Sequence, residues 1–115
     1  MTDLEGKLQI KPGQPVIILN APDGFELDAL AAEPDSSDAA VLAFVRTRAE
    51  LEGADAAFEA GRQDRLTWIA YPKAGQLGTD LNRDRLVEAV QARGLRGVRQ
   101  VAIDSIWSAL RFRPA

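Results

Sequence analysis

Residues 66–73 read Leu-Thr-Trp-Ile-Ala-Tyr-Pro-Lys, and this stretch decides the fold predicted for the chain. An apolar run ends at a proline, and a cation, Lys73, follows at once. Such a run is typical of a strand buried on both faces, and proline cannot continue the hydrogen bonding of a sheet. We therefore expect residues 66–71 to form the middle strand of a parallel sheet.

Strand-like and helix-like segments alternate on both sides of this stretch. Further strands are expected at residues 16–19, 39–45, 98–103 and 107–113, and helices at 25–32, 47–61 and from Thr79 or Asp80 to Gly94. This alternation is typical of α/β proteins, and the last strand most simply pairs antiparallel with the one before it. The predicted fold is α/β: a three-layer, Rossmann-like domain whose mostly parallel five-stranded sheet ends in a C-terminal antiparallel strand.

The helix expected from Thr47 carries the clearest local signals. Thr47 can act as its N-cap with Glu50 three residues later, as in a capping box, and Leu51, Ala54 and Phe58 fall on one face. Gly53 weakens the middle of this helix.

The composition indicates one domain. The chain has 115 residues, of which 46% are hydrophobic and 27% charged, so residues 1–115 are expected to form a single α/β domain with 1–14 as a lead-in. It contains no cysteine, its first residues do not resemble a secretory leader, and no segment approaches the ~20 apolar residues of a membrane span. We therefore expect a cytoplasmic protein that does not bind membranes.

The ionisable residues exclude several functions. With 14 basic against 17 acidic residues the net charge is −3, which argues against a nucleic-acid-binding surface. The chain has neither histidine nor cysteine, so Ser-His and Cys-His catalysis and zinc ligation by these residues are excluded. We expect no cofactor and no metal, because Asp80, Asn82 and Asp84 are more simply explained as helix-capping residues.

A ligand site is expected at one edge of the sheet. Ligands of open α/β sheets bind beyond the carboxyl ends of parallel strands. Cations at this edge, near the N-terminus of the helix that follows the glycine-containing loop 73–78, would suit a phosphate or a carboxylate. Asp23, Arg83 and Ser105 are expected nearby, and the candidate ligand-binding residues are Asn20, Arg46, Arg48, Tyr71, Lys73, Asp104 and Trp107.

Several of these residues also have a purely structural explanation. Asn20 can simply terminate a strand through a side-chain turn, and Arg46 and Arg48 can pair with nearby glutamates. Trp107 can belong to the core or to a dimer interface, and the bond before Pro72 is trans by default.

The second half of the chain resembles the end of a Rossmann-like methyltransferase, in which a strand, a helix, another strand and an antiparallel hairpin close the domain. S-adenosylmethionine-dependent methyltransferases have a glycine-rich turn after the first strand and an acidic residue at the end of the second. Here those places read Asn20-Ala21-Pro22-Asp23-Gly24 and Val45-Arg46, so the resemblance is to a truncated fold without that cofactor.

The chain is also similar to a bacterial family of unknown function, known as domain of unknown function 3052. That resemblance covers nearly the whole chain and implies a bacterial, cytoplasmic protein of no established activity. It rests on the segments Lys7-Leu8-Gln9-Ile10-Lys11-Pro12-Gly13, Leu19-Asn20-Ala21-Pro22, Phe44-Val45-Arg46-Thr47-Arg48-Ala49-Glu50-Leu51, Trp68-Ile69-Ala70-Tyr71-Pro72-Lys73, Thr79-Asp80-Leu81 and Ala102-Ile103-Asp104-Ser105-Ile106-Trp107-Ser108-Ala109-Leu110-Arg111-Phe112.

Three functions remain open on the sequence alone. The favoured hypothesis is a binding or regulatory module that holds an anionic small molecule or a protein partner at the strand ends, with a homodimer through residues 107–112 supplying a further wall. The second is an enzyme that uses Lys73 with Asp104 or Tyr71. The third is a structural protein whose arginines meet an acidic partner.

Overall fold

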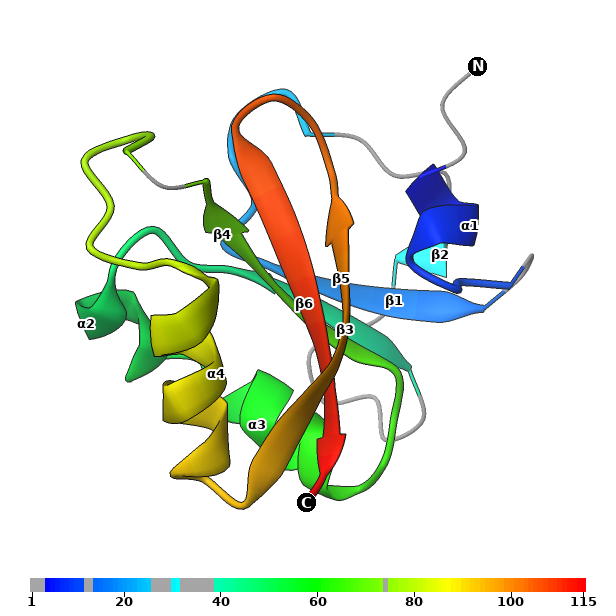
Figure 1. The fold of residues 1–115 in the computed structure, drawn as a ribbon. Helices are drawn as coiled ribbons and strands as arrows, with labels where there is room; N and C mark the ends of the chain where they lie inside the picture. The colour runs from blue at the N-terminus through cyan, green and yellow to red at the C-terminus, as the bar shows by residue number, and fades with distance from the viewer. Residues whose placement is uncertain (1–3, 12–13, 26–29, 32–38, 74) are drawn as a thin grey trace.

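The computed structural model describes residues 4–11, 14–25, 30–31, 39–73 and 75–115. Figure 1 shows its helices and strands. In chain order they are α1 (Leu4–Lys7), β1 (Pro15–Leu19), β2 (Leu30–Ala31), β3 (Ala40–Phe44), α2 (Arg48–Leu51), α3 (Asp55–Arg62), β4 (Thr67–Pro72), α4 (Arg83–Gln91), β5 (Leu95–Ala102) and β6 (Trp107–Pro114).

The strands form one six-stranded sheet in the order β2-β1-β3-β4-β6-β5. The first four strands in this order are parallel, with Ile17 opposite Val41 and Leu42 opposite Trp68. β6 lies between β4 and β5 and is antiparallel to both. β5 and β6 thus form the antiparallel hairpin that the sequence predicts, but the second strand of the hairpin, not the first, pairs with β4.

The predicted three-layer, Rossmann-like fold with five strands is therefore wrong, and the likeness to a truncated methyltransferase is not supported. The sheet is mixed and has six strands, and α2, α3 and α4 gather on one side of it. β6 is the more apolar strand of the hairpin and is buried along most of its length, whereas β5 is exposed along most of its length. The more apolar strand takes the interior position, where both of its faces are covered.

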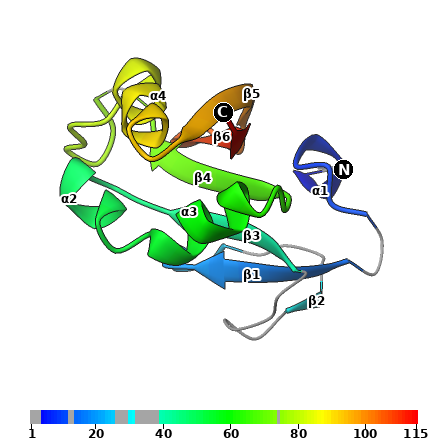
Figure 2. The same ribbon diagram turned by 90° about the horizontal axis from the view of Figure 1, so that it is seen from below.

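The sheet separates two hydrophobic clusters. The cluster beneath α2, α3 and α4 includes Leu51, Phe58 and Leu86. The opposite cluster contains Trp68 and is covered in part by α1 and the residues after it, and Figure 2 shows α1 set well apart from α2 and α4. Trp68 is 1% exposed, and its indole Nε1 donates a 2.8 Å hydrogen bond to the carbonyl oxygen of Leu8, so the N-terminal segment is fixed to the sheet.

The helix predicted from Thr47 is two helices, α2 and α3. Thr47 is the N-cap of α2, as predicted, because its Oγ1 accepts a 3.3 Å hydrogen bond from the backbone N–H of Glu50. The chain turns at Gly53, the residue expected to weaken the helix, before α3 begins. Gly61 was expected to end the helix but lies within α3, and it is buried beside Phe112.

The next helix, α4, begins later than predicted. Its N-cap is Asn82, whose side chain accepts a 2.9 Å hydrogen bond from the N–H of Arg85. Thr79, one of the two expected caps, instead donates its hydroxyl to the carbonyl oxygen of Arg46 at 2.6 Å. Gly94, the predicted stop, has a φ of +80° just beyond the helix, a conformation that glycine adopts without strain.

The first third of the chain departs most from prediction. Of the helix expected at 25–32, residues 26–29 and 32 lie outside the described ranges, and Leu30–Ala31 are a strand paired with β1. The continuous apolar run of residues 16–19 predicts a strand covered on both faces, but Ile18 in β1 is 37% exposed. Leu8 and Ile10 are buried, and α1 occupies part of the lead-in 1–14.

Candidate functional site

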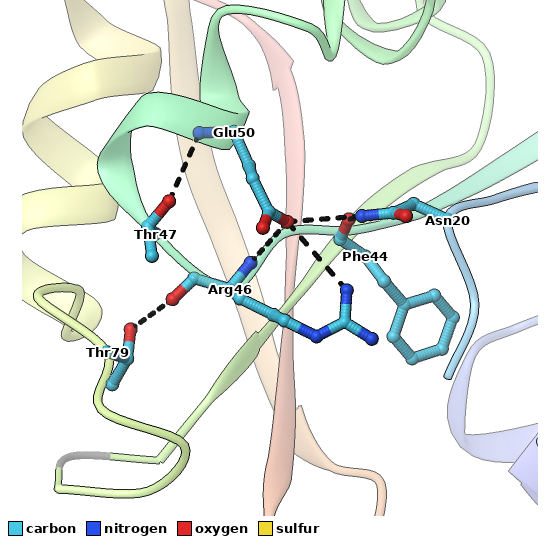
Figure 3. Close-up of polar contacts among 6 residues, drawn as sticks. All are labelled: Asn20, Phe44, Arg46, Thr47, Glu50 and Thr79. Carbon is cyan, nitrogen blue, oxygen red and sulfur yellow. Dashed lines mark hydrogen bonds and ion pairs between the residues drawn. The ribbon is translucent and has the colours of Figure 1, made fainter. Parts of the chain in front are cut away.

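A polar network joins the carboxyl ends of β1 and β3. Asn20, the first residue after β1, donates from Nδ2 to the carbonyl oxygen of Phe44 and to Oε1 of Glu50, both at 3.1 Å (Figure 3). The same Glu50 oxygen accepts a 2.9 Å hydrogen bond from the backbone N–H of Arg46 and lies 3.9 Å from Arg46 Nη1. The network fixes the two strand ends side by side.

Asn20 has a mainly structural role in this network. Its φ is +58°, in the left-handed region where asparagine is better tolerated than most residues. Its side chain also lines a cavity of about 330 Å³ with Glu50, on the α2 side of the strand ends. The strand-terminating explanation of Asn20 therefore fits its hydrogen bonds, and its place beside a cavity leaves it a candidate.

Arg46 and Trp107 come together on the other side of the sheet. The guanidinium carbon of Arg46 lies 5.7 Å from the centroid of the Trp107 ring, within the range of a cation–π interaction. The Trp107 ring packs edge-on against Phe44, with the ring centroids 5.1 Å apart. The Arg46 side chain is 35% exposed, so one side of its guanidinium rests on an aromatic ring while the other meets solvent.

A cavity of about 390 Å³ opens at this pair, a volume within the usual range of small-molecule sites. Three predicted site residues line it together: Arg46, Asp104 and Trp107. Most of its remaining wall is apolar, and among the described residues that line it Arg46 is the single cation. The other lining residues are Pro22, Asp23, Gly24, Phe25, Leu77 and Ile106.

Asp104 shapes the hairpin turn that carries Trp107. Its Oδ1 accepts hydrogen bonds from the backbone N–H groups of Ile106 and Trp107, both at 2.8 Å. This side-chain turn holds the start of β6 at the end of the parallel strands. The carboxylate is thus engaged in positioning the chain, although it remains exposed at the cavity.

Tyr71 and Lys73 do not line this cavity. Tyr71 is 3% exposed and belongs to the cluster beneath the helices, on the opposite face from Trp107. Burial raises the pKa of its phenol above the ordinary 10, against an opposing effect of the Arg83 charge. Lys73 is half-buried, and no hydrogen bond or ion pair joins its side chain to Tyr71 or Asp104. The geometry therefore gives no support to the proposed catalytic group.

Arg48 does not line the Trp107 cavity and lies at a different one. Its backbone N–H donates to Oδ1 of Asp80 at 2.8 Å, and its side chain lines a cavity of about 630 Å³ between α2 and α4. Arg85 and Arg93 line the same cavity, as do the acidic residues Glu52, Asp80 and Glu88. Because the two signs balance there, that cavity has no clear preference for an anion.

The sequence did not identify the apolar wall of the Trp107 cavity. Phe25 packs edge-on against Phe44 with ring centroids 4.8 Å apart, and Leu77 is 53% exposed in the loop after β4. Two signals could have identified them: Phe25 directly follows a turn that ends at Gly24, and Leu77 is the one large apolar residue of the loop 73–78. Neither signal tells which residues lie opposite Phe25 and Leu77 across the cavity.

Within the described ranges, no group of three or more Asp, Glu, His or Cys side chains is placed to hold a metal ion. None of the described helices is long and apolar enough to cross a membrane. β6 is paired on both of its edges in the described sheet, and Trp107 and Phe112 are buried, so no strand of a second copy can pair with it. A homodimer stays a prediction.

Comparisons of the chain with family models, with curated proteins and with solved structures gave no match. The geometry of the strand-end cavity therefore carries the argument about function.

Proposed function

We propose that this protein is a binding module whose ligand is a small acid with a planar apolar body, held in the cavity between Arg46 and Trp107. The observation that carries the proposal is the guanidinium of Arg46 resting 5.7 Å from the Trp107 ring centroid at the mouth of this cavity. A guanidinium held in this way presents donors in a fixed plane, which suits a carboxylate.

Two features of the cavity define the charge of the ligand. The contact from Arg46 Nη1 to Glu50 Oε1 is long, at 3.9 Å, so the Arg46 guanidinium keeps donors for a ligand. Asp23 and Asp104 lie at the same cavity and oppose any second negative charge there. A ligand with one acidic group therefore fits better than a polyphosphate, while Phe25, Ile106 and Trp107 accept its apolar part.

The resemblance to the bacterial family of unknown function is retained as a proposal, and with it the bacterial, cytoplasmic setting. A binding role agrees better than a catalytic one with the position of Asp104, because its carboxylate oxygen already accepts two backbone hydrogen bonds in the hairpin turn.

A thermal-shift experiment with four probes tests this proposal: 2-naphthoate, benzoate, inorganic phosphate and ATP. We expect 2-naphthoate to raise the melting temperature most, because it offers one carboxylate for Arg46 and a broad apolar ring for the wall that includes Phe25, Leu77 and Ile106. At about a hundred times its dissociation constant a ligand adds roughly 2.7 kcal/mol, which is several degrees for a domain of this size.

The variant Arg46→Ala should lose this shift while keeping the far-UV circular dichroism of the native protein. Arg62→Ala is the matched control, because Arg62 lies on α3, which contributes no residue to the lining of this cavity, and it pairs with Glu59 at 3.3 Å. An equal naphthoate shift in the Arg46 variant, or a larger shift with ATP, would contradict the proposed site.

A further inference from the structure

The hairpin of β5 and β6 places arginines directly opposite one another. Arg96 is paired with Arg113, and Arg99 with Arg111. Residues opposite each other in an antiparallel pair share a face of the sheet, and like charges in that arrangement destabilise it. A small domain therefore carries four guanidinium groups on one face of one hairpin, at a cost in stability.

This face is the one turned away from α3 and α4. Arg111 lies opposite Trp68 in β4, and Trp68 belongs to the cluster on the far side of the sheet from these helices. Alternate residues of a strand point to the same face, so Arg113 follows Arg111 there, and their cross-strand partners do the same. We call this surface the arginine face: Arg96, Arg99, Arg111 and Arg113.

The arginine face has few internal partners. Asp64 binds Arg113 with two hydrogen bonds of 2.8 and 2.9 Å, and it is the one carboxylate paired with these arginines within the described ranges. Among the described residues, Arg111 donates to the neutral side chain of Gln9 alone, and its buried Nε has no partner there. Arg99 has no side-chain partner among the described residues.

The neighbouring edge of the sheet is open. Among the described strands, β5 pairs with β6 alone, so the other edge of β5 presents backbone N–H and C=O groups that no described strand accepts. The arginines disfavour pairing of this edge with the same edge of a second copy, because two such edges would bring like charges together. The charge of this edge therefore disfavours a second copy of the same strand and favours a strand of opposite charge.

A small cavity lies on the other face of the same edge, between α4 and β5. Its volume is about 120 Å³, and the residues that line it are Val87, Val98 and Leu110 together with Gly97 and the polar residues Arg83, Arg99 and Gln100. Val98 is 39% exposed, although it is one of the few large apolar residues of β5. A strand added to β5 would direct alternate side chains to the arginine face and to this cavity.

We propose that the open edge of β5 binds an extended acidic segment of a partner protein as an additional strand. Carboxylates at alternate positions of that segment pair with Arg96 and Arg99 on the arginine face, and an intervening apolar side chain enters the cavity beside Val98. Main-chain hydrogen bonds supply affinity and the alternating side chains supply specificity, as in other strand additions.

A protein segment fits this surface better than a nucleic acid. The whole chain has a net charge of −3, which repels an extended polyanion at long range. The exposed large apolar residues of the described chain are Ile18, Leu77 and Val98, so no exposed aromatic ring offers a platform for bases. The backbone N–H and C=O groups at the open edge of β5, in contrast, are placed to form hydrogen bonds with the backbone of another strand.

The probe is a fluorescein-labelled, end-blocked peptide of sequence Val-Glu-Val-Glu-Val-Glu-Val, with binding followed by fluorescence anisotropy. We expect it to bind the native protein and to protect amides of Leu95–Ala102 against hydrogen exchange. The double variant Arg96→Glu, Arg99→Glu should weaken binding at least about tenfold, or about 1.4 kcal/mol. This variant should fold, because it replaces two like-charged cross-strand pairs with oppositely charged ones.

A charge swap makes the test specific. A peptide with lysine in place of glutamate should bind the double variant and not the native protein, whereas Arg62→Glu on α3 should leave the affinity of the acidic peptide within about twofold. The proposal is overturned by an absence of binding at millimolar peptide, by failure of the swapped pair to bind, or by amide protection outside β5. Tighter binding of an eight-nucleotide oligothymidylate would also overturn it and identify a surface for polyanions.

Discussion

The side chain of Glu50 accepts a 3.1 Å hydrogen bond from Nδ2 of Asn20, 30 residues earlier in the chain. The same carboxylate oxygen accepts the backbone N–H of Arg46 at 2.9 Å. One side chain therefore joins the end of β1 to the residues that follow β3, and it does so directly behind the guanidinium proposed to meet the ligand. Glu50 therefore helps to fix the position of Arg46 after β3.

Replacing Glu50 tests this dependence. We expect Glu50→Ala to lower the free energy of unfolding by about 1–3 kcal/mol, because the N–H of Arg46 and the amide of Asn20 each lose an acceptor. Glu50→Gln keeps a side-chain oxygen at the same place and should cost less. Urea denaturation followed by circular dichroism gives both values.

Glu52→Ala is the control for this series. Glu52 lies two residues further along, and its contact with Arg93 is a single one of 3.6 Å from a side chain that is 82% exposed. Exposed ion pairs contribute little, so this variant should stay within about 0.5 kcal/mol of the native protein. Equal losses of unfolding free energy in the Glu50 and Glu52 variants would show that the Glu50 network stabilises the protein no more than an exposed ion pair does.

The sequence predicted the elements whose local signals are complete within a few residues. β3 and β4 are continuous apolar runs and are buried at every position, and Thr47 and Gly94 have the capping roles that their residue types suggest. The order of the strands did not follow, because a strand pattern shows which residues are apolar but not which strand becomes the neighbour. Only the comparison of β5 with the more apolar β6 explains why β6 lies inside the sheet.

The same limit applies to the site. Sequence placed Arg46, Asp104 and Trp107 at one edge of the sheet, and these three do line one cavity. Tyr71 was assigned to the same edge, but strand alternation turns it to the opposite face, beneath the helices. Knowing where a strand ends is therefore enough to find the edge, but the face on which each side chain lies depends on register.

Gly61 provides a test of the packing between α3 and β6. A Cβ at this position would lie 2.7 Å from Cε2 of Phe112, whose ring is fully buried and cannot move away freely. We expect Gly61→Ala to destabilise the protein by about 1–3 kcal/mol, even though alanine favours a helix more than glycine by about 1 kcal/mol. The midpoint of urea denaturation measures the change.

Gly53→Ala is the matched control, because it makes the same chemical change where there is room. The nearest atom to its added Cβ is the carbonyl oxygen of Glu50, at 3.6 Å, an ordinary contact. We expect this variant to be neutral or stabilised by up to about 1 kcal/mol, since alanine restricts the unfolded chain. Similar destabilisation in both variants would show that the contact with Phe112 is not the cause.

The buried phenol of Tyr71 makes the stability of the protein depend on pH. Burial raises the pKa of its phenol above the ordinary 10, so the neutral phenol is favoured in the folded state. A group whose pKa is raised on folding contributes stability that is fully present below its unfolded pKa and lost as the pH rises through its folded pKa. The protein should therefore lose stability above about pH 10, the pKa of an unperturbed tyrosine.

This ionisation can be followed directly, because Tyr71 is the single tyrosine of the chain. Its absorbance near 295 nm should titrate at higher pH in the folded protein than in urea. The positive charge of Arg83 acts in the opposite direction and favours the phenolate, so Arg83→Ala should raise the pKa of Tyr71 further. Arg62→Ala, which removes a cation that exerts no such effect on Tyr71, should leave the titration unchanged. A folded-state titration that coincides with the one in urea would mean that the phenol is in contact with water, and the packing of β4 against the helices would have to be revised.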